Sequence, residues 1–418
     1  MATVEKNKDY YLSNDTQIQT ETVLLNQGGG SLGAYECGVA KVLAKYEMKF
    51  DIIAGSSIGA INAAILASNY SNKYGIKYSI KKLENFWLEI GEKTMPFCSD
   101  KHKSELAALS SLFWGNPKAF TPIWMIQGGN PFYYFFTSPY LYEITSLRNT
   151  IKKYTDFPRL QNTTKRKEEN DEKSFEEGQP NNDLLEKNND NPRLIITATN
   201  IQSGEPVTFD SDKIDITLDH VIASAGYAIY GLPWTKIGND YFWDGSFVHN
   251  TPLKAVIEAS PNLAKIVYVS DVFPLRQKKL PNSMPETYHR VRDLLFHDLS
   301  INQINEVSNI IKEHLSIIEQ MRNIILEDKD KDKDKKKKFN KIEKEYKNLL
   351  ANRKGFIINK LVHIERKESI NHHYLFEDAD FSIASIERLI KEGEMDTEDI
   401  LLKIKEKEKM GTASSISI

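Results

Sequence analysis

The sequence predicts an α/β fold with a mostly parallel central sheet, and three observations support this prediction. A short apolar strand (22–25), a helical segment and a second strand (50–54) follow one another, and an alanine-rich helix begins at residue 60. Both strand-to-helix turns contain glycine, and further apolar strands follow at 193–199 and 265–270. Because a helix connects the first two strands, they should lie parallel in one sheet with a right-handed crossover.

Composition and charge limit the class of protein. At 418 residues, with 40% hydrophobic and 27% charged residues, the chain can bury a large core as ordinary globular proteins do. Its net charge of −3 offers no electrostatic attraction to nucleic acid, so no nucleic-acid partner is expected. Two cysteines, Cys37 and Cys98, are too few for a disulfide framework or a metal cluster, which favours a reducing compartment.

The N-terminus and the hydropathy pattern indicate where the protein works. Residues 1–20 are polar and lack the apolar core of a secretory signal, so we expect a flexible arm there. No run approaches the roughly 18 apolar residues that a membrane-spanning helix needs. We therefore expect a cytoplasmic protein that touches membranes only peripherally. The oligomeric state is left open.

Two domains are expected. An α/β domain covers residues 21–275, and a mainly helical extension covers residues 285–405. Residues 161–191 carry many charges and few apolar side chains, which indicates a disordered surface insertion within the first domain. In the extension, the run DKDKDKDKKKK (328–338) predicts a solvated bend between two helices, and residues 406–418 form a polar tail. Shorter elements are expected as helices over 80–92, 218–225 and 382–391, and as strands over 206–209 and 360–364.

Residues 113–142 are unusually rich in aromatic side chains. Eleven aromatic residues fall within these thirty positions, against 10% in the whole chain: Phe113, Trp114, Phe120, Trp124, Phe132, Tyr133, Tyr134, Phe135, Phe136, Tyr140 and Tyr142. One interpretation is a small additional core beneath a long loop. The other is an apolar cap over an active site, or a face that touches a membrane. The two interpretations are compatible.

The second glycine-lined turn, Gly55-Ser56-Ser57-Ile58-Gly59, predicts a nucleophile. A serine hydroxyl attacks an ester efficiently only when a base removes its proton and donors receive the oxyanion. Small residues on both sides of Ser57 allow a sharp turn that lifts its hydroxyl above the sheet edge, at the N-terminus of the next helix. There the backbone N–H of Ile58 and the helix dipole would face developing negative charge.

The first turn, Gly28-Gly29-Gly30-Ser31-Leu32-Gly33, predicts an oxyanion-binding loop. Consecutive glycines can leave the backbone N–H groups of Gly29 and Gly30 unpaired and directed into one small cavity. A nucleotide-binding turn is the alternative, but the G-x-G-x-x-G spacing is missing, and Asp51 begins its strand where a ribose-binding acid would end one. The G-K-[ST] ending of a phosphate-binding loop is also missing.

The base that activates Ser57 is not marked by any histidine. Nine histidines are scattered along the chain, and His249 is the best placed because it follows Asp244 by five residues. A carboxylate is the alternative base, and Asp244 stands between bulky apolar residues and a glycine in Trp243-Asp244-Gly245-Ser246. Shielding by aromatic neighbours would raise the pKa of Asp244 toward that of a working base.

Three elements in this order, residues 28–33, residues 55–59 and Asp244-Gly245, resemble the patatin-like phospholipase family. The resemblance covers roughly residues 22–275 and includes the segment 220–233, which resembles the Ala-Ser-x-Ala turn before the family's aspartate. It implies a three-layer α/β/α patatin-like fold. The helices after residue 285 also resemble the extension of a bacterial subgroup of these proteins.

The resemblance also implies roles for individual residues. Ser57 would be the nucleophile and Asp244 the general base, in a dyad that uses no histidine. The oxyanion hole would come from the backbone amides of the 28–33 loop, chiefly Gly29, Gly30 and Ser31, together with Ile58. Neither a metal nor a cofactor is implied.

Two positions depart from the usual family pattern. Leu32 stands where the family often has a basic residue, and Ser246 stands where the usual pattern is Asp-Gly-Gly or Asp-Gly-Ala. Serine is only slightly larger than alanine, so we expect the turn after Asp244 to be kept.

The sequence and the resemblance together predict a lipid acyl-ester hydrolase of phospholipase A or lysophospholipase type, acting in lipid degradation through an acyl-enzyme. Its partner would be a lipid substrate, chiefly phospholipid, met during transient contact with a membrane surface. One alternative is a weakly active or inactive protein of the same fold that binds a lipid or a partner. Another is a thioesterase or neutral-lipid esterase that uses the same dyad.

Overall fold

The computed structural model describes residues 19–71, 75–93, 100–161, 191–277, 280–297, 299–327, 333–351, 353–367 and 376–409. The expected N-terminal arm and the polar insertion lie almost wholly outside the described residues, as do 328–332 of the charged bend and 410–418 of the tail. The remainder of the expected bend belongs to a helix, α14 (Lys333–Ala351).

Within the described residues the central sheet has eight strands: β1 (Thr20–Asn26), β2 (Ile52–Ser56), β5 (Arg193–Asn200), β6 (Pro206–Asp210), β7 (Thr235–Ile237), β8 (Asp240–Asp244), β9 (Ala264–Asp271) and β10 (Ile358–Glu365). Their order is β10-β9-β1-β2-β5-β8-β7, and β6 also pairs with β5. The five strands from β10 to β5 are parallel, whereas β6 and β8 run antiparallel to β5. The predicted, mostly parallel sheet is confirmed.

The helices of the described residues are α1 (Gly33–Lys45), α2 (Ile58–Ser68), α3 (Lys77–Ile90), α4 (Asp100–Trp114), α5 (Ile123–Gln127), α6 (Pro131–Thr137), α7 (Thr145–Tyr154), α10 (Leu218–Ser224), α11 (Leu253–Ala259), α12 (Met284–Phe296), α13 (Ser300–Glu327), α14 and α15 (Ile383–Lys409). A second, two-stranded sheet pairs β3 (Thr121–Pro122) with β4 (Tyr142–Glu143). In the described ranges, none of these helices has the length and hydropathy that crossing a membrane requires.

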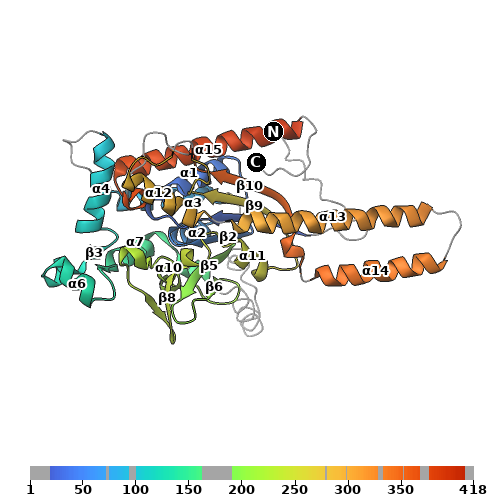
Figure 1. Ribbon diagram of the computed structural model, residues 1–418, viewed down its shortest axis with the longest axis horizontal. Coiled ribbons are helices and arrows are strands. Elements are labelled where there is room, and N and C mark those ends of the chain that lie inside the picture. Colours follow the sequence, from blue (N-terminus) through green and yellow to red (C-terminus); the bar gives the residue numbers. More distant parts are fainter. Residues whose placement is uncertain are drawn as a thin grey trace, which may run out of the picture.

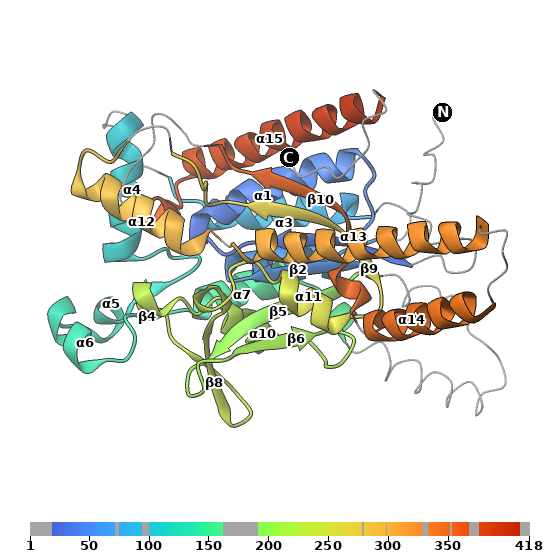
Figure 2. The ribbon, with the colours of Figure 1, turned by 45° about the vertical axis from the view of Figure 1, so that its right-hand side comes forward.

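Helices cover both faces of the central sheet, because successive side chains of a strand point to opposite faces. On one face, Leu24 and Ile53 pack with α1, α2, α3 and α15. On the other face, Val23, Leu25 and Ile52 pack with α11 and the first turns of α13. The result is a three-layer α/β/α arrangement, which Figures 1 and 2 show from two directions.

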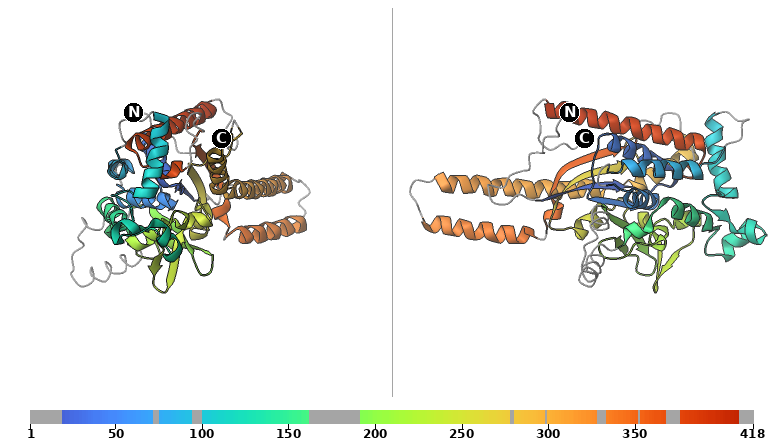
Figure 3. Two further views of the ribbon diagram at one scale, coloured as in Figure 1. Left: turned by 60° about the vertical axis from the view of Figure 1, so that its left-hand side comes forward. Right: turned by 180° about the vertical axis from the view of Figure 1, so that it is seen from behind.

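The C-terminal part of the chain is built into these layers. β10 extends the sheet by pairing in parallel with β9, and α15 crosses α1 at very close range. A Cβ on Gly38 would lie 1.9 Å from the carbonyl oxygen of Ile390, and one on Gly393 would lie 2.1 Å from that of Tyr35. Only glycine permits such an approach. The C-terminal part therefore supplies the strand expected near 360–364 and a covering helix, α15, that continues well past the expected end at 391. The helices α13 and α14 project from the body as a hairpin (Figure 3).

The sheet register brings the two glycine-lined turns together. Asn26 at the end of β1 pairs with Gly55, and Ser56 at the end of β2 pairs with Thr197 of β5. β8 then pairs antiparallel with β5, so that Ala198 faces Asp244. Parallel strands end at the same edge of a sheet, which is where ligands bind in open α/β folds. The chain segments near residues 28, 57 and 244 therefore meet at one edge.

Candidate active site

Ser57 occupies the sharp turn between β2 and α2 that the sequence predicts. Its backbone angles, φ 56° and ψ −128°, lie where a residue with a Cβ is strained. Gly55 and Gly59 allow the chain to adopt this turn. A Cβ on Gly55 would lie 2.1 Å from the carbonyl oxygen of Gly59, and one on Gly59 would lie 2.5 Å from that of Gln27. The tight turn holds the Ser57 side chain at the N-terminus of α2.

The Ser57 hydroxyl donates a hydrogen bond to Asp244, with 2.5 Å between Oγ and Oδ2. Asp244 ends β8, and its side chain is completely buried. Burial raises the pKa of this carboxyl from 3.8 to about 6, although hydrogen bonds from Ser57 and Ser246 act in the opposite direction. The carboxyl is therefore mostly ionised at neutral pH, and its basicity exceeds that of an ordinary aspartate.

The turn after β8 holds the second oxygen of Asp244. The backbone N–H and the hydroxyl of Ser246 both donate to Oδ1, at 2.8 and 2.7 Å. Gly245 lies against the sheet, where a Cβ would come within 2.2 Å of the Thr197 carbonyl oxygen. Ser246 thus keeps the turn and adds a hydrogen bond that Gly or Ala could not supply at this position.

The glycine loop passes directly beside Ser57. A Cβ on Gly28 would lie 2.7 Å from the Cβ of Ser57, so no larger residue fits at that position. Gly30 has φ +56°, and a Cβ there would lie 2.3 Å from the carbonyl oxygen of Asp378. The hydroxyl of Ser31 donates to the carbonyl oxygen of Glu377 at 3.0 Å. The short helix η6 (Glu377–Ala379) therefore supports this loop from the C-terminal part of the chain.

The predicted oxyanion donors fall into two groups. The N–H of Gly28 donates to Oδ1 of Asn250 at 3.0 Å, that of Leu32 to the Gly29 carbonyl at 3.1 Å, and that of Gly33 to carbonyl oxygens within the loop. The side chain of Leu32 is fully buried in the core. These three amides are engaged within the protein.

Gly29, Gly30 and Ile58 form the second group. They line the pocket beside Ser57, and their backbone N–H groups have no acceptor among the described residues. Ser31 does not line the pocket. An oxyanion next to Ser57 would therefore find its backbone donors among Gly29, Gly30 and Ile58.

No histidine in the described residues contacts Ser57 or Asp244. The backbone N–H of His249 bonds to the Gly245 carbonyl, but no described hydrogen bond joins its ring to either residue. His297 and His363 both contact the buried carboxylate of Asp271. Among the described residues, the alternative of a histidine base has no geometric support.

Sequence reasoning missed the residues that hold the site in place. The hydroxyl of Ser224, the last residue of α10, accepts the backbone N–H of Ser57 at 3.0 Å. Asn250 accepts from Gly28 and donates through Nδ2 to the Phe296 carbonyl at 2.8 Å. Ser224 lies within the segment 220–233 singled out by the resemblance, whereas no sequence signal marked Asn250.

Hydrogen bonds of Glu36 link the glycine loop to the helix that follows Ser57. Its buried carboxyl accepts the backbone N–H of Gln27 at 2.5 Å and the side-chain amide of Asn62 at 2.8 Å. Asn62 also donates to the Gly33 carbonyl at 2.9 Å. Burial raises the pKa of Glu36 well above its usual value. Because Gln27 precedes the glycine loop and Asn62 lies on α2, this group links the loop to the turn that carries Ser57.

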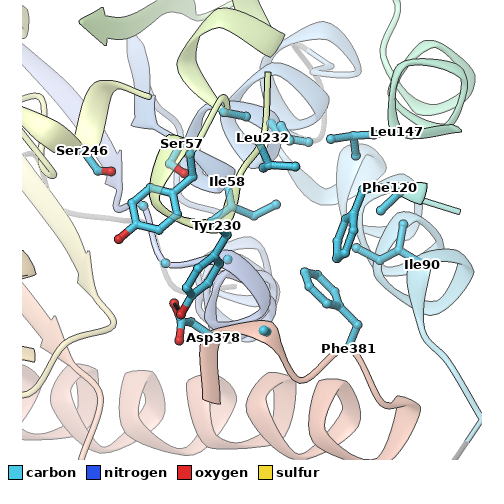
Figure 4. Close-up of a pocket in the computed structure, with 18 of the residues that line it drawn as sticks. Ser57, Ile58, Ile90, Phe120, Leu147, Tyr230, Leu232, Ser246, Asp378 and Phe381 are labelled. Carbon is cyan, nitrogen blue, oxygen red and sulfur yellow. Dashed lines mark hydrogen bonds between the residues drawn. The ribbon is translucent and has the colours of Figure 1, made fainter. Parts of the chain in front are cut away.

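A pocket opens beside Ser57, and its wall is mostly apolar. Figure 4 shows Ser57 and Ile58 on one side and Phe120 and Phe381 farther along. Among the described residues the wall contains no Lys, Arg or His, and Asp378 is its single charged residue. The remaining described wall is formed largely by Ile61, Ile90, Leu112, Ala119, Tyr142, Leu147, Ala225, Tyr227, Tyr230, Leu232, Phe273, Phe296 and Ala379.

A serine on a strand-to-helix turn, with a buried carboxylate as its partner and unengaged backbone amides beside it, is typical of the serine hydrolase class. The model of the patatin-like phospholipase family matches residues 24–257, more than half of the chain. The chain therefore belongs to the patatin-like phospholipase family, whose members are typically serine lipid hydrolases.

Comparison with solved structures finds several that resemble this chain. VipD from Legionella pneumophila is similar to this chain with 13% sequence identity and a TM-score of 0.34, over 93% of this chain and 67% of its own. No curated protein matches the sequence significantly.

Proposed function

We propose that the protein hydrolyses acyl ester bonds of lipids, as a phospholipase A or lysophospholipase, with Ser57 and Asp244 as its catalytic dyad. Family membership implies lipid acyl hydrolase activity. The observation that carries the proposal is the 2.5 Å hydrogen bond from the Ser57 hydroxyl to the buried Asp244 carboxylate at an apolar pocket.

In the first half of the proposed reaction, Oγ of Ser57 attacks the ester carbonyl carbon while Oδ2 of Asp244 takes the hydroxyl proton. The carbonyl electron pair moves onto oxygen, and the backbone N–H groups of Gly29, Gly30 and Ile58 stabilise this oxyanion. When the intermediate collapses, the bond to the alcohol breaks and the alcohol oxygen leaves with the proton from Asp244. The acyl chain remains bonded to Ser57.

The second half repeats these steps with water. Asp244 takes a proton from the water as it attacks the acyl carbonyl, and the same amides stabilise the second oxyanion. Collapse breaks the bond to Oγ, which regains its proton from Asp244, and a fatty acid leaves. A pKa of about 6 suits Asp244 for both transfers, because it accepts a proton more readily than an ordinary aspartate and still releases it near neutral pH.

The pocket wall supports an acyl chain as the group that is recognised. Aromatic and aliphatic side chains stabilise a hydrocarbon chain by removing it from water. A phosphate would favour Lys or Arg, and the described wall contains neither. We therefore propose that the acyl chain lies in the pocket and that the head group lies outside it.

The test is hydrolysis of phosphatidylcholine, lysophosphatidylcholine and p-nitrophenyl butyrate, together with labelling by a fluorophosphonate probe. We expect Ser57→Ala to abolish hydrolysis and labelling, and Asp244→Asn to lower kcat at least ~10³-fold. Ser56→Ala is the matched control, because it removes the neighbouring hydroxyl and should keep the label. Full activity of Ser57→Ala would refute the dyad.

The substrates tested also separate the other possibilities. A wild-type protein that takes no label and hydrolyses no ester would be a binding protein with this fold. Faster turnover of an acyl-thioester or a triacylglycerol than of either phospholipid would assign the same dyad to a thioesterase or a neutral-lipid esterase.

A further inference from the structure

Part of the aromatic segment lies on the surface and not in the pocket. The two short helices α5 and α6 expose six large apolar side chains, with Phe132 74% and Phe136 81% exposed: Met125, Ile126, Phe132, Tyr133, Phe135 and Phe136. We call these six residues the α5–α6 surface. Scattered exposed apolar residues are ordinary, but a cluster of this kind marks a surface that contacts something else.

The shape and charge of the α5–α6 surface limit what it can contact. α6 stands at one end of the longest axis of the molecule, opposite the hairpin of α13 and α14 (Figures 1 and 3). Residues 119–142 contain no Lys, Arg, Asp, Glu or His. A projecting, uncharged tip resembles neither a groove for a peptide nor a surface for a charged partner.

The chain segment that carries this surface also contributes to the pocket wall. Phe120 and Tyr142, at the two ends of the uncharged segment, both line the pocket, and their rings lie edge to face with 5.2 Å between centroids. β3 and β4 pair next to these residues and close the segment at its base. One uncharged stretch of chain therefore runs from the pocket wall to the exposed tip and back.

We propose that the α5–α6 surface inserts into the interface of a lipid bilayer and places the mouth of the pocket against the membrane. Aromatic rings and tyrosine hydroxyls favour the boundary between head groups and acyl chains. Apolar side chains on short interfacial helices bind membranes by burying their area there. Delivery of an acyl chain to Ser57 rests on the proposed function, whereas the docking itself does not.

A bilayer fits this surface better than a second copy of the chain does. A stable protein interface buries about 800 Å² on each partner, and two helices of 5 and 7 residues at a projecting tip offer little flat area for it. Since the tip carries no cation, docking should not need anionic lipid. Zwitterionic phosphatidylcholine should suffice, and added salt should not release the protein.

The experiment measures flotation of the full-length protein with phosphatidylcholine vesicles, in the Ser57→Ala background so that hydrolysis plays no part. Phe132→Ser combined with Phe136→Ser should lower the partition coefficient roughly a hundredfold, about tenfold for each buried ring. The matched control is Ile324→Ser combined with Leu349→Ser. These two residues, each 68% exposed, lie on the α13–α14 hairpin, and their replacement should leave partitioning unchanged.

A second variant tests insertion directly. Phe136→Trp should gain fluorescence quenching by lipids brominated in the acyl chain, relative to the parent protein. Equal partitioning of the tip and hairpin variants would overturn the proposal. Binding that requires anionic lipid and is lost in 0.5 M salt, where the Debye length is about 4 Å, would also overturn it. A change in sedimentation mass without vesicles in the tip variant would make the surface an interface between copies. Because all these readouts are independent of catalysis, a failure of the dyad would not alter them.

Discussion

Replacing Ser246 by alanine should move the acidic limb of the pH–rate profile toward higher pH. If Asp244 is the general base, the rate follows its ionised fraction, so wild-type activity should rise through pH 6 and level off above it. The Ser246 hydroxyl donates to Oδ1 of Asp244 at 2.7 Å. A hydrogen bond to the ionised form lowers a carboxyl pKa, and its loss must therefore raise the pKa of Asp244.

The size of the shift follows from what the substitution leaves in place. A hydrogen bond to a charged group contributes about 1.5–3 kcal/mol, and one pKa unit corresponds to about 1.4 kcal/mol. The backbone N–H of residue 246 and the Ser57 hydroxyl still donate to the carboxylate, so the loss is partly offset. We expect a rise of roughly 0.5–1 unit, which lowers kcat/KM at pH 6 about two- to fivefold and leaves the plateau above pH 8 nearly unchanged.

The assay is kcat/KM for p-nitrophenyl butyrate between pH 4.5 and 9. Ser203→Ala is the control, because this exposed serine lies far from the dyad in sequence and its hydroxyl bonds only within its own turn. An unchanged limb in Ser246→Ala with a normal plateau would show that Asp244 does not set the profile. A limb that moves to lower pH would contradict the assigned direction of the hydrogen bond.

Three further predictions concern stability. Burial raises the pKa of Asp244 to about 6 in the folded protein, against an ordinary value of 3.8, so the ionised carboxylate destabilises the fold above pH 6. Asp244→Asn should therefore raise the free energy of unfolding, measured in urea, by about 2–3 kcal/mol at pH 7.5. Below pH 3.8 the substitution should leave this free energy unchanged. Gly245→Ala should lower the melting temperature sharply or prevent folding, because the new Cβ would lie 2.2 Å from the carbonyl oxygen of Thr197. Gly204→Ala is the control, because its Cβ would meet no atom; its φ of +73° should lower the free energy of unfolding by only about 1 kcal/mol. Glu36→Ala leaves the buried N–H of Gln27 without its acceptor and should cost about 2–4 kcal/mol of stability in urea unfolding.

Each of these predictions has an outcome that contradicts it. A pH-independent stability difference for Asp244→Asn would mean that burial does not shift this carboxyl. Equal melting temperatures for the two glycine variants would contradict the close backbone approach at Gly245. If Glu36→Gln were as unstable as Glu36→Ala, a single retained acceptor and the retained side-chain volume would not suffice, and the loss would have to be assigned to the second carboxyl oxygen, so that both the bond from Gln27 and the bond from Asn62 are needed.

The Ser57–Asp244 pair and the glycine loop beside it could be predicted because each of these elements depends on a short stretch of sequence. A serine between small residues after an apolar strand implies a sharp turn, whatever the rest of the chain does. The Asp244-Gly245 turn and the 28–33 loop are equally local. Leu32 illustrates the limit of such local prediction, because the sequence of the loop does not indicate that its side chain is buried in the core.

Patterns within short stretches of the chain were enough to predict the α/β fold class, the two strand-to-helix turns and the residue types of the site, since these depend on local hydrophobicity and on small residues at turns. The three-dimensional contacts were needed to show which amides remain unengaged and that Ser224 and Asn250 hold the turns. They were also needed to show that Ser246 faces the carboxylate, and that the aromatic segment divides between pocket and surface. These features arise where strands far apart in the chain meet at one edge, and long-range register is not encoded in any single stretch of sequence.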